Sequence, residues 1–267
     1  MIVFPPAARL RRAAVVGALC AGLTVAVTGC GEDPDEGTNG VGKLSADQIE
    51  DKARAAATAA DAVRLSGTVV SGGKTFTLDM RLKSDGAAGE VRTTGSTFEL
   101  LRVGDELYLK ADAAFWGRKP AANASASPRP GESDGPDGSG ESEDGASAAD
   151  KLGDKFVKVP AGDSSYKQLR GFTEMDVLLD GLLGLNGKLE KGAYRKVGVV
   201  RTIEVTADEG RGGRLDVSLA GTPYPLRLER AGGAGVVELK DWGKPFALEA
   251  PPEDQTVDYG PQLPSRD

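Results

Sequence analysis

The chain has 267 residues, with 33 Lys and Arg against 40 Asp and Glu and a formal net charge of −7. This balance excludes the basic surface on which nucleic-acid binding depends. The sequence contains no histidine, so it lacks the usual base of a Ser or Cys triad and the commonest zinc ligand. Carboxylates that could cleave glycosides fall mostly on strand faces and in turns, where charge is solvated. We therefore expect no catalytic residue, no metal, no cofactor and no nucleic-acid partner.

The acidic residues are concentrated in two segments that predict little structure. Residues 32–36 carry four acids, and residues 120–150 carry seven acids against the single Arg129. The two remaining segments, 43–119 and 151–267, together carry no net charge. A neutral body excludes a polybasic patch as the means of attachment to a membrane.

Residues 1–29 have the features of a lipoprotein signal peptide. Arginines lie within residues 9–12, an apolar run spans residues 13–27, and Gly29 is the small residue that a signal peptidase needs before the cut. The run is shorter than the roughly 20 apolar residues of a transmembrane helix. Val27-Thr28-Gly29-Cys30 closely matches the bacterial lipoprotein pattern, which implies cleavage between Gly29 and Cys30 and a diacylglycerol on the Cys30 thiol. We expect a protein anchored by lipid at the extracytoplasmic face of the cell membrane.

The residues after the expected cleavage site predict a flexible stalk and then a domain without disulfides. Residues 31–42 are small and polar, so we expect residues 30–42 to link the lipid to a single domain at 43–267. Cys20 lies inside the signal peptide and Cys30 is used by the lipid. No intramolecular disulfide is expected, although the compartment is oxidising.

Residues 43–65 predict a helix. Ser45 and Gln48 have the spacing of a capping box. Apolar or small residues recur at alternating steps of four and three, which indicates a narrow stripe that packs closely on a sheet. The stripe consists of Ile49, Ala53, Ala56, Ala60 and Val63. Such a helix could cover a cavity or be an ordinary packed helix.

From Ser66 the hydrophobic period changes to two, which indicates strands. Apolar and polar side chains alternate along residues 75–83, so that strand has one apolar and one polar face. Turns at Asp85-Gly86 and Gly104-Asp105 join further strands in an antiparallel meander. These strands span residues 89–94, 98–103 and 106–110.

The middle of the chain predicts an insertion. Residues 111–118 indicate a short helical turn that carries Phe115 and Trp116. Residues 120–150 have no large apolar side chain, so burial cannot offset the entropy of ordering them. We expect a disordered acidic insertion within one domain, because a strand pattern resumes at residues 155–159. A flexible hinge between two independent domains is the alternative.

A second helix is expected from residue 172, with Thr173 as its cap and acids in its first turn. The period of two then returns, and Pro223 and Pro225 indicate a strand that lies at an edge or begins late. The strands expected here lie near residues 194–207, 214–220, 225–229 and 236–240. The order of elements predicts an α+β fold with helices and ten or eleven strands.

Short motifs along the mature chain resemble one family. They are Leu65-Ser66-Gly67-Thr68, Val103-Gly104-Asp105-Glu106-Leu107-Tyr108-Leu109, Phe156-Val157-Lys158-Val159-Pro160, Pro223-Tyr224-Pro225-Leu226-Arg227, Asp241-Trp242-Gly243-Lys244-Pro245 and Ala250-Pro251-Pro252. Together with the lipobox at Cys30, they make the chain resemble the actinobacterial LprG/LppX type of lipoprotein, relatives by fold of the LolA and LolB lipoprotein carriers. The resemblance implies an unclosed antiparallel half-barrel of about eleven strands wrapped around helices, with an apolar cavity between sheet and helices.

Apolar side chains of the strands and of the second helix are candidates for lining such a cavity. They are Phe76, Leu78, Met80, Leu82, Phe98, Leu100, Leu178 and Leu182. On this hypothesis the protein is a monomeric, non-enzymatic carrier that binds a lipid or lipoglycan, because burial of alkyl chains releases water. Alternatively these residues form a solid core, and the protein is an interaction or sensory module of the cell envelope.

Overall fold

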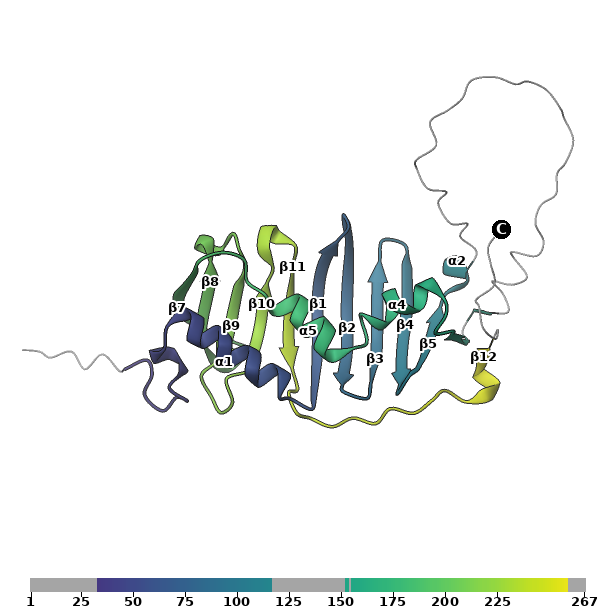
Figure 1. The fold of residues 1–267 in the computed structure, drawn as a ribbon, viewed down its shortest axis with the longest axis horizontal. Coiled ribbons are helices and arrows are strands. Elements are labelled where there is room, and N and C mark those ends of the chain that lie inside the picture. The colour runs from purple at the N-terminus through teal and green to yellow at the C-terminus, as the bar shows by residue number, and fades with distance from the viewer. Residues whose placement is uncertain (1–32, 117–151, 154, 259–267) are drawn as a thin grey trace, which may run out of the picture. The chain divides into compact units, whose positions relative to one another are not determined.

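The computed structural model describes residues 33–116, 152–153 and 155–258 (Figure 1). The described residues from Pro34 onward belong to one compact unit, so the strands before residue 117 and after residue 151 share that unit. The expected signal peptide, Cys30 and the expected insertion at 120–150 lie outside the described residues.

A single sheet organises the described residues. It has twelve strands in the order β12-β6-β5-β4-β3-β2-β1-β11-β10-β9-β8-β7, and its two edge strands do not pair with each other. The strands are β1 (Ala62–Ser71), β2 (Lys74–Lys83), β3 (Gly86–Thr93), β4 (Ser96–Val103), β5 (Glu106–Ala111), β6 (Phe156–Val159), β7 (Leu189–Val197), β8 (Val200–Ala207), β9 (Arg214–Ser218), β10 (Pro225–Glu229), β11 (Gly235–Lys240) and β12 (Thr256–Asp258). All pairs are antiparallel except β12 with β6. The expected α+β architecture with an unclosed, mostly antiparallel sheet is confirmed.

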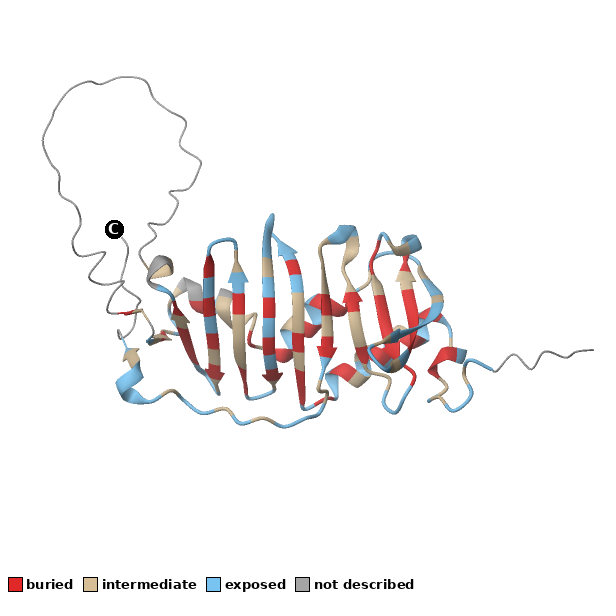
Figure 2. Ribbon diagram, turned by 180° about the vertical axis from the view of Figure 1, so that it is seen from behind, coloured by how far each residue is buried: buried red, intermediate tan, exposed pale blue. Residues whose placement is uncertain are grey.

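Helices lie along one face of this sheet (Figures 1 and 2). They are α1 (Ala46–Thr58), α2 (Ala113–Trp116), α4 (Ser164–Arg170) and α5 (Met175–Leu183). In the described part of the chain, no helix is both long and apolar enough to cross a membrane. Short 3₁₀ turns occupy Val41–Lys43, Asp208–Gly210, Ala231–Gly233 and Glu253–Gln255.

The first helix begins as the sequence predicts and ends earlier. The capping box is present: Ser45 Oγ accepts from Gln48 N at 3.4 Å, and Gln48 Oε1 accepts from Ser45 N at 3.2 Å. The prediction of a helix to Leu65 is wrong, because α1 ends at Thr58 and Val63 lies in β1. Two neighbouring strands, β2 and β11, pair with residues 62–65. These ladder hydrogen bonds outweigh the continuing helical period of the side chains. The buried positions of α1 are Ala46, Ile49, Ala53 and Ala57.

The expected alternation in the meander is confirmed. In β2, Leu78, Met80 and Leu82 are buried on the helix side, and the residues between them are exposed. Met80 lies opposite Gly89 of β3. A Cβ atom at Gly89 would lie 2.2 Å from the carbonyl oxygen of Asp79 and 2.7 Å from Met80 Sδ, so the glycine makes room for both the backbone and the side chain of β2.

The second helix was predicted with the wrong start and the wrong cap. α5 begins at Met175 with Glu174 at its N-cap, and residues 164–170 form the separate helix α4, which the sequence analysis missed. Thr173 instead donates its hydroxyl to the carbonyl oxygen of Arg170 at 2.9 Å. Thr173 therefore serves the end of α4, and Glu174 occupies the N-cap of α5.

The expected flexible stalk is attached to the sheet over residues 34–42. The side-chain amide of Asn39 donates to the carbonyl oxygens of Ser218 and Gly221, at 3.0 Å each. Val41 is buried in the apolar cluster. These contacts arise between residues far apart in sequence, so a polar composition alone did not reveal them.

The chain after β11 runs beneath the strand ends and returns at β12 (Figure 1). At its start, Trp242 stacks on Tyr224 with ring centroids 4.9 Å apart, and its Nε1 donates to the carbonyl oxygen of Pro225 at 3.0 Å. Gly243 N donates to the carbonyl oxygen of Ala62 at 2.9 Å. Pro225 is the first residue of β10, which lies between β9 and β11. Of the two alternatives for this strand, an edge position and a late start, the late start is therefore correct.

Two carboxylates oppose each other on the face of the sheet away from the helices. Glu204 of β8 is in register with Asp216 of β9, and both are buried. Arg195 Nε pairs with Glu204 Oε2 at 2.9 Å, and Thr202 donates to Asp216 Oδ1 at 3.3 Å. Burial, and then the negative charge of Glu204, raise the pKa of Asp216 above its ordinary value.

Replacing Asp216 with asparagine should raise the melting temperature at pH 7 by about 2 °C. A raised carboxyl pKa means that stability is lost as the pH rises through the folded-state pKa, and asparagine removes that loss while still accepting from Thr202. The difference should vanish below the ordinary pKa of 3.8. Asp79→Asn is the control of opposite sign, because the hydrogen bond from Arg64 lowers the pKa of Asp79. A lower melting temperature for Asp216→Asn at pH 7 would contradict this account.

Candidate functional site

The structure brings the predicted cavity residues together on the helix side of the sheet. All of them belong to one apolar cluster or pack against it. Leu78, Met80, Leu82, Leu100 and Leu182 are at most 4% exposed, and Phe98 is 8% exposed. Phe76 and Leu178 are half-buried at the margin of the cluster. In this arrangement the helices cover the apolar face.

Helix α5 covers the part of this face that lies over the middle of the sheet. Met175, Leu179, Leu182 and Leu183 are buried, whereas Val177 on the outer side of the helix is 55% exposed. Just before α5, the ring of Phe172 packs on Phe76 with centroids 5.9 Å apart. The cover is therefore a layer one helix thick.

Helix α5 has little stability of its own. It has 9 residues, and Glu174 at its N-cap makes no side-chain capping hydrogen bond. Isolated helices shorter than about 12 to 15 residues are marginal in water. Gly181 inside the helix costs about 1 kcal/mol relative to alanine. Packing on the sheet thus holds α5 in place, and segments of this kind open more readily than the sheet beneath them.

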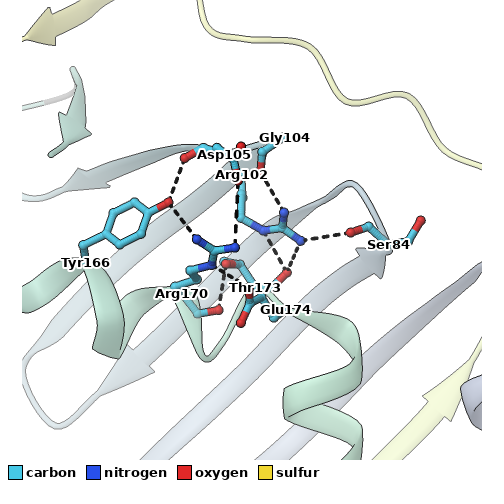
Figure 3. A network of polar contacts seen from close by, with 8 residues as sticks. All are labelled: Ser84, Arg102, Gly104, Asp105, Tyr166, Arg170, Thr173 and Glu174. Carbon is cyan, nitrogen blue, oxygen red and sulfur yellow. Dashed lines mark hydrogen bonds and ion pairs between the residues drawn. The ribbon is translucent and has the colours of Figure 1, made fainter. Parts of the chain in front are cut away.

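A buried arginine ties this helical cover to the sheet (Figure 3). Arg102 of β4 is 4% exposed and faces the helices. Its Nε and Nη2 both donate to the carbonyl oxygen of Thr173, at 3.2 and 3.0 Å, between α4 and α5. Its Nη1 donates to the carbonyl oxygen of Gly104 at 2.8 Å, and its Nη2 reaches that of Ser84 at 3.5 Å. The guanidinium thus bridges two strand turns and the connection between the helices.

A second arginine beside it is neutralised by acids (Figure 3). Arg170 Nε pairs with Glu174 Oε1 at 2.5 Å, and its Nη2 lies 3.9 Å from Asp105 Oδ1. Tyr166 donates its hydroxyl to the carbonyl oxygen of Asp105 at 2.8 Å. These contacts dock α4 onto the β4–β5 turn. They also pair the carboxylates of Asp105 and Glu174 with Arg170.

The sequence analysis missed Arg102, although the alternation in β4 contained the signal. Phe98 and Leu100 were placed on the inward face, and the same period of two places Arg102 there as well. A charged side chain at an inward position is rare and marks a site that needs an explanation. Its partner Thr173 lies 71 residues away, so the contact itself could not be predicted.

A hollow of about 220 Å³ lies where the end of α5 meets the turn between β10 and β11. Its lining includes Gly181 and Gly184 from the helix side, and Ala231 and Ala234 from the turn. Leu185 also lines it and packs against the apolar cluster. The edge of the helical cover is therefore incompletely filled at this point.

A larger, open hollow of about 380 Å³ lies on the opposite face of the sheet. Asp79, Glu90 and Glu99 contribute carboxylates to it. Asp79 pairs with Arg64 at 2.8 Å, and Glu90 pairs with Arg92. Ala88, Leu101 and Phe156 also line this hollow, and it is open to water. No group of three metal-ligating side chains occurs within the residues that the structure describes.

These features define a class of protein: a single open, mostly antiparallel sheet with one apolar face under a thin helical cover. No family model and no curated protein matches the chain. LprF from Mycobacterium bovis has a similar solved structure, at 15% identity and a TM-score of 0.47, over 77% of this chain and 96% of that one. An uncharacterized conserved protein from Thermus thermophilus is also similar, at 10% identity and a TM-score of 0.35, over 80% of this chain and 98% of that one. Neither likeness carries information on function.

Proposed function

We propose that this protein is a non-enzymatic, lipid-anchored lipoprotein of the extracytoplasmic membrane face that binds or carries a lipid or lipoglycan by its acyl chains. The acyl chains lie between the sheet and the helices, in contact with Leu78, Met80, Leu82 and their neighbours. The proposed organisation is a signal peptide at 1–29, a diacylglycerol on Cys30 and one domain from Pro34 onward that acts as a monomer. No cofactor takes part.

The apolar sheet face under a marginal helix is the observation that carries this proposal. Exposing the four buried side chains of α5 would cost about 1.5 to 3 kcal/mol each. An acyl chain of about 14 methylenes gains about 0.8 kcal/mol per methylene on burial. One acyl chain therefore offsets the displacement of α5, and two or three chains outweigh it. The hollow beside Leu185, which Asn186, Glu229 and Arg230 also line, lies at the edge of this cover.

The experiment is mass spectrometry of material that co-purifies with the soluble domain, followed by delipidation and titration with a fluorescent acyl probe. Co-purified lipid and saturable probe binding are expected. The complete burial of most cavity candidates favours the competing function, an interaction or sensory module with a solid core. A domain that contains no lipid and takes up no probe, but retains a protein partner, would establish that alternative.

Changing Cys30 to alanine should release unprocessed or soluble protein from the membrane fraction, because acylation needs the thiol. Arg201 donates to the carbonyl oxygen of Pro34, so only residues 31–33 separate Cys30 from the sheet-attached segment. At about 3.5 Å per residue, the lipid would hold the β7–β8 end of the domain close to the membrane. Cell fractionation measures the release, with Cys20→Ala as the control that leaves the lipobox intact. A Cys30→Ala protein that is still processed and membrane-held would contradict the anchor.

A further inference from the structure

Arg102 is a buried cation at one end of the apolar face. In the register of the sheet it lies between Ala87 of β3 and Leu107 of β5, both of which are fully buried. Within the described ranges no carboxylate forms an ion pair with it, and its hydrogen bonds go to carbonyl oxygens alone. Buried charges in proteins are normally paired with an opposite charge. The neighbouring acids Glu174 and Asp105 are engaged by Arg170 instead.

The geometry of the guanidinium matches an anion. Its Nε and Nη2 form one edge of the planar group, and both donate to the single carbonyl oxygen of Thr173. That edge is the one that binds two oxygens of a carboxylate or phosphate in bidentate pairs. Thr173 precedes α5, so displacement of the helical cover removes this acceptor. The bonds to Gly104 and Ser84, both in strand turns of the sheet, keep the side chain in position.

We propose that Arg102 binds the anionic head of an amphiphile, a carboxylate or a phosphate, whose acyl chain lies on the apolar face. This assignment rests on the proposed function. A head group at Arg102 takes the place of the Thr173 carbonyl, and the alkyl chain takes the place of the α5 side chains. Ligand binding and release of the cover are then one event. The site selects amphiphiles with a charged head over neutral ones of the same chain length.

The test compares cis-parinaric acid with its methyl ester, two fluorescent probes with the same chain and different heads, on the delipidated domain at pH 7.5. The wild-type domain should bind the acid at least about tenfold more tightly than the ester, since each 1.4 kcal/mol is a factor of ten and a charge-assisted pair exceeds that. Arg102→Met should bring the two affinities within about twofold by weakening the acid alone. Arg81→Met, the same change at an exposed position of β2, should leave the ratio unchanged.

Failure of this inference and failure of the proposed function give different results. If the wild-type domain and Arg102→Met have the same ratio, Arg102 is a structural clamp and the carrier function stands. If the wild-type domain binds neither probe, both proposals fail. Arg102→Lys keeps the charge without the bidentate edge, so it should retain part of the preference for the acid over the ester. This variant replaces Arg102→Met in the test if the Met variant does not fold. Oleate and lysophosphatidic acid should displace the bound acid at lower concentrations than monoolein; equal displacement by all three overturns the assignment.

Discussion

Replacing Trp242 with alanine should lower the free energy of unfolding by about 3 kcal/mol, the lower end of the range for losing a large aromatic side chain from a core. The lower end applies because Trp242 is half-buried. Its ring stacks on Tyr224 at an interplanar angle of 2°, and its indole N–H reaches the carbonyl oxygen of Pro225. The residue therefore fastens the segment after β11 to the start of β10. Urea unfolding of the soluble domain measures the change.

Trp242→Phe is the matched control, because it keeps an aromatic ring against Tyr224 and removes the hydrogen bond to Pro225. It should cost about 1 kcal/mol, the usual net value of one hydrogen bond. If Trp242→Ala melts like the wild-type domain while uptake of an acyl probe falls, the ring belongs to the binding site and is not a structural clamp.

Replacing Met80 with tryptophan should lower the free energy of unfolding by about 1 to 3 kcal/mol and also reduce binding of an acyl probe. Met80 has no exposed surface and packs against Gly89, so an added indole has no free volume while the helices cover the sheet. The same indole would occupy space on the face where the alkyl chain is proposed to lie. Thermal melting and probe titration on one protein sample give both values.

Met80→Leu is the control, since a swap that conserves volume in a core usually costs less than about 1.5 kcal/mol and leaves the apolar face intact. It should bind the probe like the wild-type domain. A Met80→Trp variant with unchanged melting temperature and reduced binding would show that the face opens without strain. Clear destabilisation together with no binding by the wild-type domain would favour the interaction module.

The fold was largely predictable because most of its strands have a local sequence signal, the alternation of apolar and polar residues. Side chains in β2 must alternate between the apolar cluster and water, and that requirement appears directly as a period of two in residues 75–83. The capping box of α1 was equally local, because Ser45 and Gln48 are neighbours on one helical turn. The inward positions of the strand candidates, such as Leu78 and Leu100, were predictable for the same reason, because alternation assigns every second residue to the same face.

The start of helix α5 was not predictable by such reasoning. Thr173 has a good capping residue type, yet its carbonyl is bound by Arg102 and its hydroxyl by the end of α4. Helix and capping propensities reflect only a residue's type and its near neighbours in sequence. Here a contact from a distant strand decided the role of Thr173. The end of α1 failed in the same way, because pairing of residues 62–65 with β2 and β11 is invisible in the helical period.

The sequence by itself determined the class of most elements, the apolar and polar faces of the strands and the expectation of a lipid anchor at Cys30. Each of these depends on residues within a few positions of one another. The tertiary structure alone decided that residues 34–42 are attached to the sheet, that β12 returns to pair with β6, and that the guanidinium of Arg102 is buried beneath the helical cover. These are contacts between segments far apart along the chain, such as the 71 residues between Arg102 and Thr173. The free energy of these contacts depends on where the whole sheet places each segment. That placement cannot be derived from a local pattern of residues.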